Sequence, residues 1–337
     1  MTEERFNDIG RMEAIRRLYE GTPFKPFRNS SFKASCETLI TTCSRLFTEG
    51  IDFDLIYFPL KHLGYKFVTA VTGELYAALA KPETLCITLG ISAKLDFGHI
   101  GELWSGIVAA AAEHGYSDVS LELCPSPNGL TAGISASGTT SPAMEKKRPA
   151  AASKDLICVS GSLGAAFLGM QVLEREKRNF SESADDSRQP ELEKYRMLVG
   201  SYLKPELSPY IVSRLEETGI IPSHGYLVSK GLSDAVKRLV RDSGLGAKIY
   251  ADRIPFEGNS FALGQELNID PVSAAMNGGD DFRLLFTVPI LEAEKFRRDF
   301  QTFDIIGHLA QPEVGAVLVT PDGVELPMKA QGWPDDD

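Results

Sequence analysis

The turn GSLGAAFLG, residues 161–169, has a glycine spacing suited to phosphate chemistry. It follows the apolar run DLICVS, which predicts a strand, and it precedes a helical pattern. Backbone N–H groups at the start of a helix can bind a phosphate. The turn lacks the Lys-Ser/Thr of a Walker motif and the full GxGxxG pattern. Two interpretations therefore remain open, close backbone packing at the helix start and direct phosphate contact.

Two adjacent aspartates, Asp280 and Asp281, follow a pair of glycines in the segment NGGDD. Such a composition is typical of a turn, because Asp side chains accept hydrogen bonds from nearby backbone N–H groups. The segment therefore predicts a turn with a helix or strand cap, and a ligand-binding role is the alternative.

The histidines and cysteines are scattered along the chain. No two of the five histidines have metal-ligand spacing, and no two of the five cysteines form a CxxC pair. We therefore expect core, cap or surface roles for the histidines and reduced, mostly packing cysteines, which are typical of a cytoplasmic protein.

Composition and charge exclude several classes of protein. Of the 337 residues, 43% are hydrophobic and 24% are charged, which is a globular balance. The net charge of −11 argues against general nucleic-acid binding, although a small anionic ligand needs only a local basic cluster. No apolar stretch is long enough to span a membrane, and the N-terminus lacks the apolar core of a signal peptide.

A change of composition near residue 150 divides the chain into two predicted domains, residues 1–150 and 151–337. The segment 135–154 is rich in Ser, Ala and Pro and is predicted to be a linker or long loop. In the first half, helical patterns at 62–80 and 97–114 alternate with β-rich runs. In the second half we expect a strand at 156–160, helices at 164–176, 206–218 and 232–243, and the strands AKIYA, RLLFTV, DIIGHL and AVLVT. This alternation predicts α/β or α+β layers in both domains.

Six segments together resemble the thiamine-monophosphate kinase family, which belongs to the aminoimidazole ribonucleotide synthetase superfamily. They occur in the order and spacing of the family and cover nearly the whole chain. The segments are EGIDFDL (49–55), PLKHLGYK (59–66), DLICVSGSLGAAFLGMQVLEREKR (155–178), AMNGGDDFRLLFTVP (275–289), IIGHL (305–309) and KAQGW (329–333).

The resemblance implies a fold and a reaction. The expected fold is α/β (α+β), with a β-rich N-terminal domain that pairs with its twin in a homodimer and provides half of the nucleotide cleft, and a C-terminal α/β domain. The family transfers the terminal phosphoryl group of ATP to thiamine monophosphate, giving thiamine diphosphate. Its clustered aspartates hold Mg²⁺, which neutralises the charge of the two phosphorylated substrates.

Most of these aspartates are replaced in the first domain. Arg28 and Asn29 stand at the first aspartate pair of the family, and Arg45 stands at the single aspartate of a later Thr-Asp. Asp52 replaces a histidine that contacts the substrate. Only Glu74 and Glu122 keep an acid at metal positions, and each is one methylene longer than the aspartate of the family. Two interpretations of these glutamates remain open. They share a metal ion, or they are ordinary acids on a helix face and at a strand end.

The second domain has lost the same chemistry but keeps other features. The Asp-x-Ser-Asp-Gly signature is Leu227-Val228-Ser229-Lys230-Gly231 here. The resemblance assigns nucleotide contacts to Arg148, Ser229, Lys230 and Gly231, and substrate contacts to Asp280, Asp281 and Trp333. Arg283 stands where a glutamate is usual. Trp333 either covers the thiamine ring or pins the C-terminal tail.

Three cations, Arg28, Arg45 and Lys230, thus occupy former metal positions or are simply solvated surface charges. At about 4 Å and an effective dielectric constant near 20, one such charge attracts a phosphate or repels a metal ion by roughly 4 kcal/mol. We therefore expect a kinase-like protein with weak or lost phosphotransfer that still binds ATP or thiamine monophosphate, and for which Mg²⁺ is doubtful. The alternatives are an active phosphotransferase with altered metal use or substrate, and a structural or regulatory subunit that pairs with an intact kinase.

Overall fold

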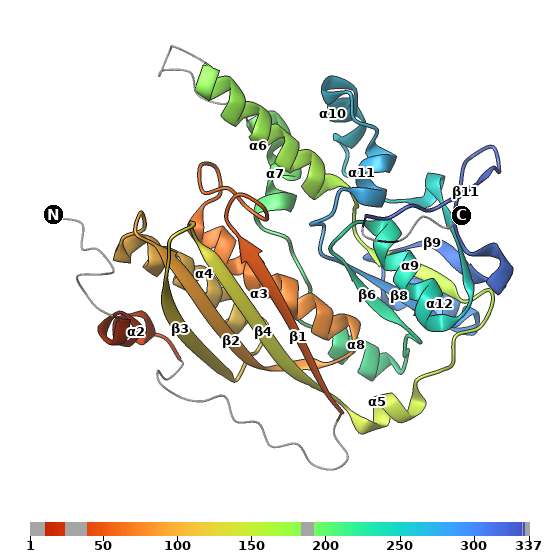
Figure 1. Ribbon diagram of the computed structural model, residues 1–337. Helices are drawn as coiled ribbons and strands as arrows, with labels where there is room; N and C mark the ends of the chain where they lie inside the picture. Colours follow the sequence, from red (N-terminus) through yellow and green to blue (C-terminus); the bar gives the residue numbers. More distant parts are fainter. Residues whose placement is uncertain (1–10, 24–38, 183–191, 332, 334–337) are drawn as a thin grey trace. The chain divides into compact units, whose positions relative to one another are not determined.

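The computed structural model describes residues 11–23, 39–182, 192–331 and 333, whose helices and strands are shown in Figure 1. The chain divides into two compact units. Unit 1 comprises the described residues of Met1–Leu75 and Ala80–Pro142, and unit 2 those of Tyr76–Leu79 and Ala143–Asp337. Within the described residues, no helix has both the length and the apolar character needed to cross a bilayer.

Unit 1 is built on a four-stranded sheet with the strand order β1–β4–β2–β3. β4 pairs antiparallel with β1 and β2, whereas β2 and β3 are parallel and are joined by the crossover helix α4. Helices α3 and α4 cover one face of the sheet (Figure 1). The bounds are α2 Arg11–Tyr19, β1 Leu39–Thr48, α3 Leu60–Ala77, β2 Lys81–Ser92, α4 Phe97–Glu113, β3 Asp118–Ser126 and β4 Thr131–Thr140.

The core of unit 1 follows from strand alternation. Leu85, Ile87 and Leu89 of β2 are almost fully buried against the helices, because successive side chains of a strand point to opposite faces. The helices approach closely where Gly64 of α3 meets Gly106 of α4. A Cβ atom at either glycine would overlap a backbone carbonyl of the other helix, so both positions require glycine.

Unit 2 is built on a seven-stranded mixed sheet with the strand order β11–β10–β7–β9–β5–β8–β6. Only the β7–β10 pair is parallel. The strands are β5 Leu156–Ser160, β6 Gly225–Val228, β7 Gly246–Tyr250, β8 Arg283–Val288, β9 Phe303–Ala310, β10 Ala316–Val319 and β11 Glu325–Pro327. The helices are α5 Pro142–Lys147, α6 Ala165–Glu182, α7 Arg196–Leu203, α8 Ile211–Thr218, α9 Leu232–Ser243, α10 Ser260–Leu267, α11 Pro271–Asn277 and α12 Ala293–Asp299, with short 3₁₀ helices at Glu193–Tyr195, Ala251–Arg253, Ile290–Glu292 and Pro312–Val314.

Two sets of apolar side chains hold unit 2 together. The larger core contains residues of β5, β7 and β8 packed with Val236 of α9 and Ala275 of α11, all fully buried. The second set is aromatic, with Phe286 of β8 stacked on Phe303 of β9 at 5.7 Å and Phe296 on Phe300 at 5.0 Å between ring centroids. This packing holds β6, β8 and α11 in fixed positions. The turns that follow β6 and α11 carry several of the predicted site residues.

The structure confirms the predicted α/β class, and most of the expected elements are present. α9 has the predicted bounds, and α4 ends one residue before the predicted end. The predicted helix 206–218 is too long, because α8 begins only at Ile211. The predicted linker 135–154 is wrong in its first half. β4 continues to Thr140, where ladder bonds to β1 and β2 outweigh the low strand propensity of its Ser, Ala and Gly residues, and α5 follows.

Candidate functional site

The turn after β6 and the turn after α11 lie side by side in unit 2. The backbone N–H of Asp280 donates a 2.9 Å hydrogen bond to the carbonyl of Ser229. Gly231 allows this contact, because a Cβ atom there would overlap the carbonyl oxygen of Met276. Its φ of +89° also favours glycine. The structure thus brings the predicted residues Ser229, Lys230, Gly231 and Asp280 into one turn cluster.

This turn cluster carries an apolar and a basic side chain at two positions where the family that the sequence resembles has aspartates. Leu227 is fully buried and pairs with Leu284 of β8, so it belongs to the packed interior and offers no oxygen to a cation. Lys230 is exposed in the turn between Ser229 and Gly231. Its ammonium group attracts anions and repels divalent cations. Neither residue fits a magnesium ion.

Asp281 caps the N-terminus of α6. Its carboxylate accepts hydrogen bonds from the backbone N–H groups of Gly164, at 2.8 Å, and Ala166, at 3.1 Å. Burial of the side chain, which is 4% exposed, raises the pKa of Asp281 to about 7, and the two hydrogen bonds act in the opposite direction. Both carboxylate oxygens of Asp281 therefore accept hydrogen bonds from N–H groups at the start of α6.

Other residues of the protein likewise occupy the space around the turn GSLG. A Cβ atom at Gly164 would lie 2.8 Å from the backbone nitrogen of Ala275, so the glycine permits close packing. The guanidinium of Arg283 donates to the carbonyl of Ser162 at 3.3 Å and lies against Gly161. These contacts support the packing interpretation of this turn, because its helix-start N–H groups already bind Asp281.

Arg148 lies at the end of α5 and is tied to its surroundings. Its Nε donates to Glu145 at 2.9 Å and its Nη2 to the carbonyl of Ala78 at 3.3 Å. The pKa of His224 is lowered by burial, and the charge of Arg148 lowers it further against the opposing effect of Asp242. Arg148 therefore has neutral and acidic partners within unit 2, and its side chain is about a quarter exposed.

Trp333 packs on the polar side of α9. Its indole N–H donates a 2.9 Å hydrogen bond to Asp234, and the cationic groups of Lys237 and Arg241 lie 5.7 and 5.5 Å from its ring. Cation–π contacts of this kind stabilise an aromatic ring in place. These contacts support the interpretation that Trp333 pins the tail segment to α9.

In unit 1, Arg45 and Glu74 lie on the side of the sheet that α3 covers. The Arg45 guanidinium lies 4.9 Å from the ring of Phe47. The thiol of Cys43, two residues before Arg45 on β1, donates to the carbonyl of Val71 on α3. Burial, followed by the charge of Glu74, raises the pKa of Cys43 to about 12. Glu74 is therefore close to this thiol.

Glu122 lies on the opposite, open face of the same sheet. It is exposed on β3 and is in register with Thr88, whereas its neighbours Leu121 and Leu123 point to the helices. The structure does not bring Glu74 and Glu122 together. Across the described residues, no three His, Cys, Asp or Glu side chains form a group that could hold a metal ion.

The remaining predicted residues have simpler positions. Asp52 accepts a 2.8 Å hydrogen bond from the backbone N–H of Thr48 and so closes the loop after β1. Arg28 and Asn29 lie outside the described residues. Among the described cysteines, Cys43, Cys86, Cys124 and Cys158 are free thiols.

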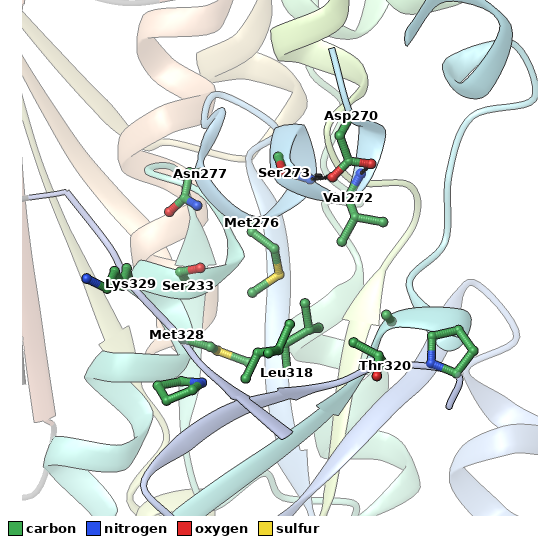
Figure 2. Close-up of a pocket in the computed structure, with 14 residues that line it drawn as sticks. Ser233, Asp270, Val272, Ser273, Met276, Asn277, Leu318, Thr320, Met328 and Lys329 are labelled. Carbon is green, nitrogen blue, oxygen red and sulfur yellow. Dashed lines mark hydrogen bonds between the residues drawn. The ribbon is translucent and has the colours of Figure 1, made fainter. Parts of the chain in front are cut away.

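Sequence reasoning missed a cavity beside the turn cluster. It has a volume of about 430 Å³ and is shown in Figure 2. It lies between the start of α9, α11 and the β10–β11 hairpin. Ser233, Met276, Asn277 and Met328 are among its lining residues. Their only signal in the sequence is proximity to the segments SKGL, NGGDD and KAQGW.

Comparison with known proteins gives consistent relatives. No family model matches the chain. The thiamine-monophosphate kinase of Rhodopirellula baltica is 23% identical over 252 residues, which are 74% of this chain and 69% of that protein. The structure of AaThiL complexed with AMPPCP and TMP superposes with a TM-score of 0.70 at 18% identity and covers 97% of each chain.

A protein of another function has the same fold. HypE of E. coli, a hydrogenase maturation protein, superposes with a TM-score of 0.73 at 12% identity, over 96% of this chain and 98% of that chain. At such identities a structural likeness shows the fold alone. The predicted two-domain architecture of the aminoimidazole ribonucleotide synthetase type is confirmed.

Proposed function

We propose that this chain is a distant member of the thiamine-monophosphate kinase family, whose proteins it resembles in sequence and fold. In this proposal it binds phosphorylated ligands of the kinase type without magnesium and has weak or no phosphotransfer. The observation that carries this proposal is the turn after β6. There the buried Leu227 and the exposed Lys230 stand at two acidic positions of the family. A fixed ammonium group neutralises part of a phosphate's charge, but it cannot bridge two phosphates or polarise a transferring group as a metal ion does.

The proposed ligands are ATP and thiamine monophosphate. A relative with this fold was solved with AMPPCP and TMP. Arg148, Ser229, Lys230 and Gly231 are our proposed contacts to the nucleotide, and Lys230 is the strongest candidate because it is exposed. Asp52, Asp280, Asp281 and Trp333 are the family-derived candidates for substrate contact. Asp281 and Trp333 would have to give up present hydrogen bonds to serve that role.

The proposal includes a homodimer formed through unit 1. β1 carries the exposed apolar side chains Ile40 and Leu46, with exposures of 38% and 62%. Both alternate onto the face opposite α3 and α4. Two such faces, each from one copy, would cover these side chains. Analytical ultracentrifugation should find a dimer that Leu46→Arg disrupts, and a monomeric wild-type protein would contradict this part.

A coupled assay tests the loss of phosphotransfer. We expect no turnover of ATP and thiamine monophosphate above the uncatalysed rate, with or without Mg²⁺. Turnover that EDTA abolishes would instead establish an active phosphotransferase with an altered metal site. No thermal response to either ligand would favour a structural or regulatory subunit, and co-purification with an intact kinase would then be the next test.

A further inference from the structure

Two backbone hydrogen bonds join the turn NGGDD to the end of β6 and the turn that follows it. The N–H of Asp280 donates to the carbonyl of Ser229 at 2.9 Å. The N–H of Phe282 donates to the carbonyl of Val228, also at 2.9 Å. Asp281 lies between the two donors along the chain. The backbone on either side of Asp281 therefore sets the position of the turn after β6.

The residues on both sides of Asp281 have strained backbones. Asp280 has a φ of +61° and Phe282 a φ of +48°, in the left-handed region that residues other than glycine rarely adopt. Such conformations persist only where surrounding contacts hold them. Phe282 supplies one such contact, since its side chain is fully buried. The carboxylate of Asp281 supplies a second, polar anchor.

This carboxylate joins the strained turn to α6. Its two oxygens accept hydrogen bonds from the N–H groups of Gly164 and Ala166, at 2.8 and 3.1 Å. A continuous path of contacts thus runs from the start of α6 through Asp281 to the turn after β6, where Lys230 is exposed. A displacement of the carboxylate would shift the two backbone hydrogen bonds to that turn, and with them the backbone of Lys230.

The charge of the Asp281 carboxyl group controls how firmly it holds α6. An ionised carboxylate accepts hydrogen bonds at both oxygens, whereas protonation turns one oxygen into a donor. Of the charged groups around it, Arg283 at the start of β8 lowers the pKa of Asp281 and Asp280 raises it. Lys230 and Glu206 on the neighbouring segments are exposed to solvent. Burial has the largest effect and raises the pKa of Asp281 to about 7, so both forms occur near neutral pH.

We propose that Asp281 is the positioning residue for Lys230. Its carboxylate holds the strained turn NGGDD against α6, and this turn holds the backbone of Lys230 where the side chain meets a phosphate. The phosphate contact rests on the function proposed above, whereas the coupling between the two turns does not. In this role Asp281 acts through Lys230 and touches no ligand itself.

Amide NMR of the full chain, isotope-labelled at glycine, alanine and lysine, tests the coupling without a ligand. We expect the signals of Gly164 and Ala166 to shift with a midpoint of about pH 7. The signals of Lys230 and Gly231 should follow with the same midpoint. Asp281→Asn keeps the shape of the side chain but has no charge to lose, so it should flatten all four profiles. A Lys230 signal that does not titrate in the wild type, or that titrates equally in Asp281→Asn, would overturn the proposal.

Asp155→Asn is the matched control. Asp155 is also 4% exposed, and it also accepts hydrogen bonds from two backbone N–H groups, those of Ala152 at 2.8 Å and Ile290 at 3.3 Å. These contacts involve neither turn. The pH profiles of Lys230 and Gly231 should therefore persist in Asp155→Asn. Their loss in this variant as well would indicate a general effect of weakening unit 2 and would overturn the proposal.

A double-mutant cycle with ATP in EDTA, at about pH 8 where Asp281 is ionised, connects the coupling to phosphate binding. Asp281→Asn should weaken ATP binding about fivefold in the wild-type background and less than about twofold in Lys230→Met, because both residues act on one contact. Equal losses in the two backgrounds would contradict the proposal. Failure of the wild type to bind ATP would refute the proposed function, and the pH profiles would still decide the positioning role. Thermal unfolding checks that each variant is folded.

Discussion

The carboxylate of Asp281 accepts a 2.8 Å hydrogen bond from the backbone N–H of Gly164. This bond joins two segments that the sequence presents as separate candidate sites, the turn NGGDD and the turn GSLG. An internal carboxylate thus takes the place that a bound phosphate would occupy at the start of α6. The proposed phosphate contact therefore rests on the turn after β6, where Lys230 is exposed.

Removal of the Asp281 side chain should destabilise the fold. Asp281→Ala leaves two buried N–H groups at the start of α6 without acceptors, and we expect a loss of about 1–3 kcal/mol in the free energy of unfolding. Chemical denaturation measures it. Asp252→Ala, at an exposed position in the 3₁₀ helix after β7, is the control and should change stability by less than about 0.5 kcal/mol. Equal effects of the two substitutions would show that the cap is unimportant.

Gly231 should be far less tolerant of substitution than Gly244. Both have positive φ, +89° and +66°. A Cβ atom at Gly231 would overlap the carbonyl of Met276, whereas nothing lies within 4 Å of a Cβ atom at Gly244. Gly244→Ala should therefore cost only the backbone strain, about 1 kcal/mol, and Gly231→Ala about 3 kcal/mol or more. Similar midpoints of urea unfolding for the two variants would contradict the close approach of the two turns.

Stability should fall as the pH drops from about 6.5 to 4 because of His114. This side chain is 4% exposed, and its burial lowers the pKa of His114 to about 4 against a weaker, opposing effect of Glu113. In this window the unfolded chain binds a proton that the folded protein does not, so the free energy of unfolding decreases by at most about 3 kcal/mol. His114→Gln should show a flatter pH dependence than the wild type between these limits. Parallel curves would exclude a contribution from His114.

Reversal of the charge at Lys230 should weaken anion binding. Lys230→Asp replaces an attraction to phosphate by a repulsion, and for this exposed group we expect about a tenfold loss in affinity for ATP, with a weaker dependence on salt. Isothermal titration calorimetry in EDTA measures it. Lys204→Asp changes another exposed lysine, at the end of α7, and should leave the affinity within about twofold. If both variants bind alike, Lys230 is an ordinary surface charge.

Local patterns in the sequence predicted most of the fold. The helix α9 could be predicted because its apolar positions repeat at helical spacing up to a glycine, and the strands of unit 2 because they are short apolar runs between turns. β4 was partly missed, since Ser, Ala and Gly form a strand there only through pairing with β1 and β2. Pairing partners distant along the chain leave no local signal.

The candidate site was less predictable for the same reason. The pairs Asp281–Gly164 and Trp333–Asp234 join residues more than ninety positions apart, so a cap and a pinned aromatic look like ligand contacts in the sequence. The loss of acids at Leu227 and Lys230 could be predicted from the family resemblance alone. The cavity that Ser233 lines could not, because it forms only where the start of α9, α11 and the β10–β11 hairpin meet.

Thermal unfolding with ATP, measured once in EDTA and once in Mg²⁺, tests the central claim most directly. A ligand that binds only the folded protein raises its midpoint, and the rise grows with ligand concentration. We predict that ATP raises the midpoint in EDTA at least as much as it does in Mg²⁺, because Lys230 rather than a metal ion faces the phosphate. A rise that occurs only when Mg²⁺ is present would contradict metal-free phosphate binding.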